Sequence, residues 1–60
     1  MRLQDYPEVA VEGAPGFVNH LGWLVATFPT SEGRTKAVVL AEWDGKMDVH
    51  VFDMTYIKEI

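Results

Sequence analysis

The pattern of apolar and polar residues is clearest over residues 36–53, KAVVLAEWDGKMDVHVFD, where two apolar runs flank Asp44 and Gly45. Asp-Gly adopts positive φ readily, as a type I′ turn requires, so this stretch predicts a β-hairpin. A loop of three residues would set Glu42 directly opposite Asp48, an unfavourable pair of like charges. We therefore expect a loop of two residues, and this choice fixes the register of the whole hairpin.

This register divides the predicted strands, residues 37–43 and 47–52, into two faces, because cross-strand partners share a face. One face collects five apolar residues, and we expect it to form the core: Val38, Leu40, Met47, Val49 and Val51. The other face combines aromatic, charged and aliphatic side chains: Val39, Trp43, Lys46, Asp48, His50 and Phe52.

The first part of the chain also alternates, in EVAVE at residues 8–12, which predicts a half-buried strand with its two valines on one side. The following Ala-Pro-Gly-Phe, residues 14–17, is typical of a type II turn, since proline presets φ and glycine supplies positive φ. After residue 53 we expect a tight turn and a brief closing strand, with Ile57 and Ile60 pointing inward.

The middle of the chain, residues 17–28, fits two structures. Its apolar residues fall at helical spacing, which would give a β-α-β-β domain with a helix over residues 15–28. Against the helix, Gly22 costs about 1 kcal/mol relative to alanine, and Trp23, Val25 and Thr27 favour strands. We favour a strand over GWLVATF, with GFVNHL as an irregular segment before it.

Composition limits the chain to one small domain, residues 1–60, with 48% hydrophobic and 23% charged residues. A domain of this size buries only about 60% of the surface that its unfolded chain exposes, so its core stabilises it weakly. No cysteine is present to form a disulfide, and His20 and His50 are too far apart in sequence to suggest a metal site. We therefore expect no cofactor, and self-association becomes plausible.

The predicted order of elements resembles the SH3-like small barrel: a strand, a long loop, a strand, a polar loop, a tight hairpin and a short closing strand. The segments that carry the resemblance are VAVEGAPGFV, EWDGKM and VHVFDMTYIKEI. It implies an all-β barrel of about five short strands. The chain lacks the Ala-Leu-Tyr-x-Tyr pattern of the members that bind proline-rich peptides, and fold alone does not determine function.

A narrower resemblance is to the plasmid-type trimethoprim-insensitive dihydrofolate reductases, through GWLVATFPTSEGR and VHVFDMTYIKEI. In that family four identical chains form one pore, lined by a Gln-Ile-Tyr strand that binds folate and NADPH. The resemblance implies that His50, Val51 and Phe52 would occupy those places. His stands where the family has Gln, and Phe where it has Tyr, so the activity itself is in doubt.

The leading functional hypothesis is a non-enzymatic module that binds protein, either a partner or itself, through the mixed face of the hairpin. Trp43, His50 and Phe52 would supply aromatic anchors, which are common at interface hot spots, and Lys46 and Asp48 a polar rim. The alternative for this face is structural, because a loop over residues 19–23 could fold across it and bury it.

The net charge of −4 opposes the phosphate attraction on which most nucleic-acid binders rely. Nucleic-acid binding would require oligomerisation to gather Arg2, Arg34, Lys36 and Lys46 on one side. No signal segment or membrane span is recognisable, so we expect a cytoplasmic protein. A small acidic chain that starts with its own Met1 suits an accessory or inhibitory protein of a phage or plasmid.

Overall fold

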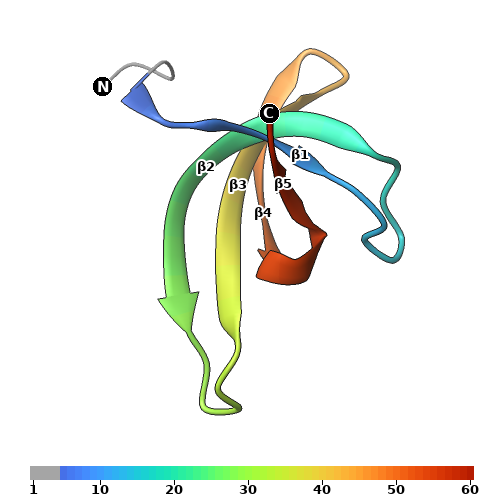
Figure 1. Ribbon diagram of the computed structural model, residues 1–60. Helices are drawn as coiled ribbons and strands as arrows, with labels where there is room; N and C mark the ends of the chain where they lie inside the picture. The colour runs from blue at the N-terminus through green and yellow to red at the C-terminus, as the bar shows by residue number, and fades with distance from the viewer. Residues whose placement is uncertain (1–4) are drawn as a thin grey trace.

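The computed structural model describes residues 5–60, which form a single antiparallel sheet of five strands in the order β4-β3-β2-β1-β5 (Figure 1). The elements are β1 (Glu8–Val11), β2 (His20–Pro29), β3 (Thr35–Trp43), β4 (Lys46–Asp53), the 3-10 turn η2 (Met54–Tyr56) and β5 (Ile57–Glu59). The predicted all-β class is confirmed. The alternative with a helix over residues 15–28 is wrong, because most of that segment belongs to β2.

The hairpin of β3 and β4 has the predicted register along its whole length. Trp43 lies opposite Lys46 and Leu40 opposite Val49. The turn contains Asp44 at φ 51° and Gly45 at φ 80°, as a two-residue type I′ turn requires. This turn therefore sets which residues of β3 and β4 share a face.

The assignment of the core to one of those faces was wrong. Ala37, Val39, Ala41 and Phe52 are buried, together with Val9, Val11 and Ala14. In contrast, Met47, Val49 and Val51 of the predicted core face are 45%, 52% and 53% exposed. We call the face with Val39 and Phe52 the inner face of the hairpin and the face with Val49 and Val51 its outer face.

The inner face forms the core because other segments pack against it. Leu24 of β2, Met54 and Tyr56 of η2, and Ile57 of β5 surround the buried residues. β2 also approaches so closely that a Cβ at Gly22 would lie 2.7 Å from Cγ1 of Val39. Small residues are required at such a position, and the interior has room for only a few large side chains.

Strand β2 serves both halves of the sheet, and it curves strongly between them (Figure 1). Its first residues pair with β1 and its later ones with β3. The register with β3 shifts between Leu24 and Ala26, so Val25 is an extra residue, a β-bulge. Bulges bend a strand and increase its twist, which is consistent with this curvature.

The predicted type II turn and the closing strand agree with the structure, whereas the predicted position of Ile60 does not. Phe17 N–H donates a hydrogen bond of 3.2 Å to the carbonyl of Ala14, and Gly16 has φ 80°, which confirms the type II turn. The closing strand β5 is confirmed, with Ile57 partly buried against the core. The inward position predicted for Ile60 is wrong, since this residue is 71% exposed.

Candidate functional site

The structure separates the six residues predicted to bind a partner into three groups. Val39 and Phe52 are buried, at 1% and 5% exposure, and offer no free surface within this single chain. Trp43 and His50 are half-buried, and only Lys46 and Asp48 are exposed. The six residues do share one face, as expected, but that face is largely covered.

An aromatic cluster covers the inner face, formed by Phe17, His20, Trp43, His50 and Phe52. The Phe17 ring lies edge-on to the rings of Phe52 and His50, with centroid distances of 4.9 and 5.0 Å. The His20 and Trp43 rings are 4.4 Å apart. Such edge-to-face contacts stabilise a packed arrangement. The face is therefore partly covered, but the cover comes from the side chains of Phe17 and His20, and residues 20–23 belong to β2 rather than to a loop.

His20 anchors the loop that carries Phe17. Its Nδ1 lies 2.8 Å from the carbonyl oxygen of Val18, and a carbonyl only accepts, so Nδ1 is the protonated nitrogen. Nε2 of His20 and Nε1 of Trp43 are both buried, with no hydrogen-bond partner among the described residues. Unsatisfied buried polar atoms cost stability, so this end of the cluster packs at some energetic expense.

Asp48 sits at the exposed border of the cluster and makes two contacts. Its Oδ2 lies 3.7 Å from Nε2 of His50, and its Oδ1 accepts a hydrogen bond of 3.1 Å from the backbone N–H of Val49. The Asp48 side chain is 64% exposed, so solvent screens this contact, which is an ion pair only when His50 is protonated. Among residues 5–60 no third group orients this pair, and it lines neither of the hollows described below, whereas a general base needs both an orienting group and a pocket.

The outer face of the hairpin, in contrast, has no cover among the described residues that would bury its apolar side chains. Two rows of neighbours cross three strands: Val49, Leu40 and Trp23 in one row, and Val51, Val38 and Ala26 in the other. Each row starts on β4, at the valine that is about half exposed. Grouped exposed apolar side chains often mark an interaction site.

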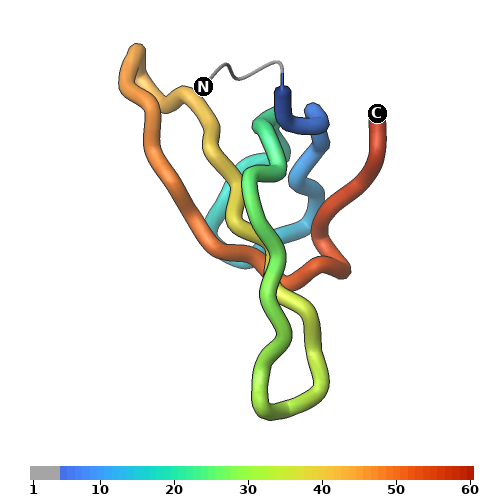
Figure 2. Tube along the Cα trace, turned by 90° about the vertical axis from the view of Figure 1, so that its left-hand side faces the viewer, coloured from blue at the N-terminus to red at the C-terminus, as the bar shows by residue number. Residues whose placement is uncertain are grey.

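Strand β4 is also an edge of the sheet, with β3 as its one paired neighbour among residues 5–60 (Figure 2). In an antiparallel ladder, opposed residues alternate between hydrogen-bonded and non-hydrogen-bonded pairs. Trp43 and Lys46 flank the turn as a hydrogen-bonded pair. Met47, Val49 and Val51 therefore direct their backbone N–H and C=O groups away from β3. The Val49 N–H donates a hydrogen bond to the Asp48 side chain, which agrees with this assignment.

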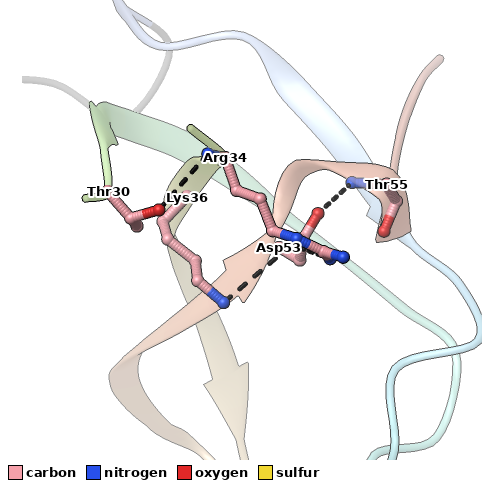
Figure 3. A network of polar contacts seen from close by, with 5 residues as sticks. All are labelled: Thr30, Arg34, Lys36, Asp53 and Thr55. Atoms are coloured by element: carbon pink, nitrogen blue, oxygen red, sulfur yellow. Dashed lines mark hydrogen bonds and ion pairs between the residues drawn. The ribbon is translucent and has the colours of Figure 1, made fainter. Parts of the chain in front are cut away.

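The opposite end of the hairpin holds a small polar network centred on Asp53 (Figure 3). Oδ1 of Asp53 accepts a hydrogen bond of 3.0 Å from the backbone N–H of Thr55, at the start of η2. Nη1 of Arg34 lies 3.2 Å from Oδ2, and Nζ of Lys36 lies 4.0 Å from it. The Thr55 bond, followed by Arg34, lowers the pKa of Asp53 below its ordinary value. This network joins β4 to the loop between β2 and β3.

Two hollows open on the surface. The larger, about 400 Å³, lies beside β1 and β5, with an apolar lining and Glu8 and Glu59 among its residues. The smaller, about 200 Å³, lies beside the start of β2 and includes Asn19 and His20. Neither contains a nucleophile next to a base, so neither has the arrangement of a catalytic site.

Within residues 5–60 no group of three or more potential metal ligands comes together. The same residues include no helix with the length and apolar character needed to cross a membrane. No protein-family model matches the chain, and neither a curated protein nor a solved structure shows significant similarity to it. The functional argument therefore depends on the geometry of this chain alone.

Sequence reasoning missed the outer face as a candidate surface because it assigned Met47, Val49 and Val51 to the core. One available signal was the size of the inner side chains. On β3 the inner Ala37 and Ala41 are smaller than the outer Val38 and Leu40, as the close approach of β2 to the inner face requires. The volumes of these β3 side chains, rather than the apolar count, were the signal for the inner face.

Proposed function

We propose that this protein is a non-enzymatic protein-binding module whose binding site is the free side of β4. The observation that carries the proposal is the coincidence of two features on one strand. Met47, Val49 and Val51 expose about half of their side chains, and the backbone groups of the same three residues face away from β3. We call these three residues, with their free backbone edge, the β4 surface.

A partner strand added to this edge would satisfy those backbone groups and cover the adjacent apolar side chains. Strand addition is a common way to bind an extended protein segment, with the backbone supplying affinity and the side chains specificity. Natural proteins protect exposed edges with charges, and Lys46 and Asp48 are such charges here. These charges therefore make the edge selective, so that it pairs with a partner strand that carries a group complementary to the Asp48 carboxylate.

We also propose that the fold is an SH3-like small barrel. The supporting observations are the sheet order β4-β3-β2-β1-β5, the bulge at Val25 that bends β2, and the 3-10 turn before β5. Within such a barrel the Phe17 loop covers the inner face of the β3–β4 hairpin. Binding through β4 then requires no opening of that cover.

The two alternative functions gain no support from the geometry. A reductase-like pore would need the side chains of His50 and Phe52 on a free surface, and Phe52 is in the core. For nucleic acid, Arg34 and Lys36 already contact Asp53, and Lys46 lies at the other end of β4. Arg2 lies outside the described residues.

A photo-crosslinking experiment tests the proposed site. A photoreactive side chain is placed at position 51 in one variant and at position 18 in a control, because Val18 is an equally apolar residue that is 71% exposed on the loop before β2. We expect a specific protein adduct from position 51. Where the adduct is to a different protein, excess unlabelled wild-type protein should suppress it, whereas excess Val51→Lys protein should not.

Two results would count against the site. Adducts that form equally from positions 18 and 51 would show that exposure alone determines labelling. An adduct from position 51 that the Val51→Lys protein suppresses as well as wild type would show that the apolar side chain does not contribute. Far-ultraviolet circular dichroism of each variant verifies that the sheet is intact.

A further inference from the structure

We infer that the partner strand is β4 of a second copy of this chain, paired antiparallel with Val49 of one copy opposite Val49 of the other. This inference rests on the proposed function and names its partner. It concerns β4 rather than β5 because β4 has eight residues, whereas β5 has three, two of them charged. A longer edge offers more backbone groups for pairing.

The register follows from the side chains that an antiparallel two-fold pairing would place opposite one another. A two-fold axis at Val49 sets Met47 opposite the second copy's Val51, so apolar residues meet on the outer face. On the inner face it sets Asp48 opposite the second copy's His50. Each of these pairings occurs twice by symmetry, which makes the interface self-complementary.

The neighbouring registers are poorer. An axis at Asp48 would place two Asp48 carboxylates directly opposite each other, an unfavourable like-charge pair. An axis at His50 would place Met47 opposite Asp53 and Asp48 opposite Phe52, which pairs carboxylates with apolar side chains. Only the axis at Val49 matches apolar with apolar residues and Asp48 with a group that can donate to it.

The contacts of Asp48 in the single chain fit this arrangement. Its carboxylate already bonds the Val49 N–H, the group at the centre of the proposed ladder, and lies 3.7 Å from its own His50. Formation of the ladder transfers the Val49 N–H to the partner's backbone and frees the carboxylate. Asp48 can then pair with His50 of the other copy, so no buried polar group is left unsatisfied.

Single-cysteine variants test the register, since the natural sequence contains no cysteine. At the proposed axis the two Cα atoms of residue 49 would lie about 5.5 Å apart, within the range of a disulfide. The two copies of residue 51 would be roughly 13 Å apart, four residues along the strand at about 3.3 Å each. Val51 is the matched control because it is 53% exposed and Val49 is 52% exposed.

Under mild oxidation we expect Val49→Cys protein to form a disulfide-linked dimer at least about tenfold faster than Val51→Cys protein. A mixture of Met47→Cys and Val51→Cys proteins should crosslink to each other faster than either does to itself. Equal rates at positions 49 and 51 would overturn the register. Light scattering that finds wild-type protein monomeric up to millimolar concentration would overturn the self-association itself.

A charge exchange gives a second, independent test. His50→Asp places two carboxylates opposite one another in the dimer, and Asp48→Lys removes the acceptor that faces His50, so each should weaken self-association about tenfold, since two symmetric contacts are lost. Mixing the two variants sets the introduced lysine opposite the introduced aspartate at one contact and keeps Asp48 opposite His50 at the other, so it should recover association to near the wild-type level. Mixing without recovery overturns the pairing of Asp48 with His50.

The His50→Asp variant also loses a ring of the aromatic cluster, so its folding is verified by near-ultraviolet circular dichroism, while the cysteine variants leave the inner face unchanged.

The outcome separates this inference from the proposed function. A monomeric wild type with a specific adduct from position 51 to another protein retains the β4 surface and rejects self-pairing. If the wild type is monomeric and no specific adduct forms from position 51, both the self-pairing and the β4 surface are rejected.

Discussion

The two faces of the β3–β4 hairpin carry similar numbers of apolar residues, but they have opposite surroundings. The inner face is covered by the Phe17 loop, by β2 and by η2, and its side chains are buried or half-buried. At β4 the apolar rows of the outer face are about half exposed, with no segment of residues 5–60 burying them. Burial in this small sheet therefore depends on what folds over each face, and the hydrophobicity of the face itself does not decide it.

The largest expected difference between the faces is at two adjacent residues of β4. Phe52→Ala removes a buried ring at the inner face and should lower the free energy of unfolding by about 3–5 kcal/mol. This is a large part of the total free energy of unfolding expected for a domain of this size. Val51→Ala, one residue away on the outer face, should cost less than about 1 kcal/mol. Urea unfolding followed by circular dichroism measures both. Similar costs would mean that the faces are not distinguished by packing.

Trp43 tests the comparison at the border of the covered face. Its ring contacts His20 and Phe17 and is half-buried, so Trp43→Ala should destabilise the fold by about 2 kcal/mol, less than a fully buried aromatic residue. Self-association of the folded fraction should be unchanged, because β4 keeps its outer side chains. Light scattering and urea unfolding on the same samples separate these effects. Lost association with unchanged stability would return the binding site to the inner face.

The smallest effect is expected at Asp53, and it should depend on pH. The Thr55 backbone N–H and Arg34 lower the pKa of Asp53 in the folded chain, whereas an unfolded aspartate titrates near 3.9. The charged carboxylate therefore stabilises the fold above that pH, and the contribution is lost as pH falls through the lowered pKa. Asp53→Asn should reduce the unfolding temperature slightly at pH 7, and the difference from wild type should shrink as the pH falls through the lowered pKa of Asp53.

A deficit for Asp53→Asn that stays constant as the pH is lowered through the lowered pKa of Asp53 would show that the charge on Asp53 contributes nothing. Asp48→Asn is the matched control, because this carboxylate also accepts a backbone hydrogen bond but its side chain is 64% exposed, against 11% for Asp53. We expect its deficit at pH 7 to be smaller.

Much of the local structure could be predicted from the sequence. The Asp44-Gly45 turn determines the hairpin register because few residue pairs accept positive φ at both positions, and that constraint is local. The strand over residues 22–28 could also be favoured, since Gly22 and the β-branched residues disfavour a helix, although the structure starts this strand at His20, within the segment predicted to be irregular. Both predictions depend on nearby residues and on backbone sterics.

The candidate site could not be predicted in the same way, because the covering of a face depends on contacts between distant segments. Phe17 is 35 residues from Phe52 in sequence and no periodicity links them, yet their ring centroids are 4.9 Å apart. The terminal Ile60 was assigned inward by its type alone, but β5 ends before it. Local patterns determined the strands, whereas the long-range fold determined which side of them faces a partner.

The bulge at Val25 has a consequence for how variation in β2 should be interpreted. Before the bulge the even-numbered Leu24 shares a face with Val39, and after it the odd-numbered Thr27 shares a face with Ala37. The extra residue thus inverts the odd–even phase of the strand midway. A single alternating pattern therefore cannot describe β2, and the positions before and after Val25 have to be assigned to the two faces separately.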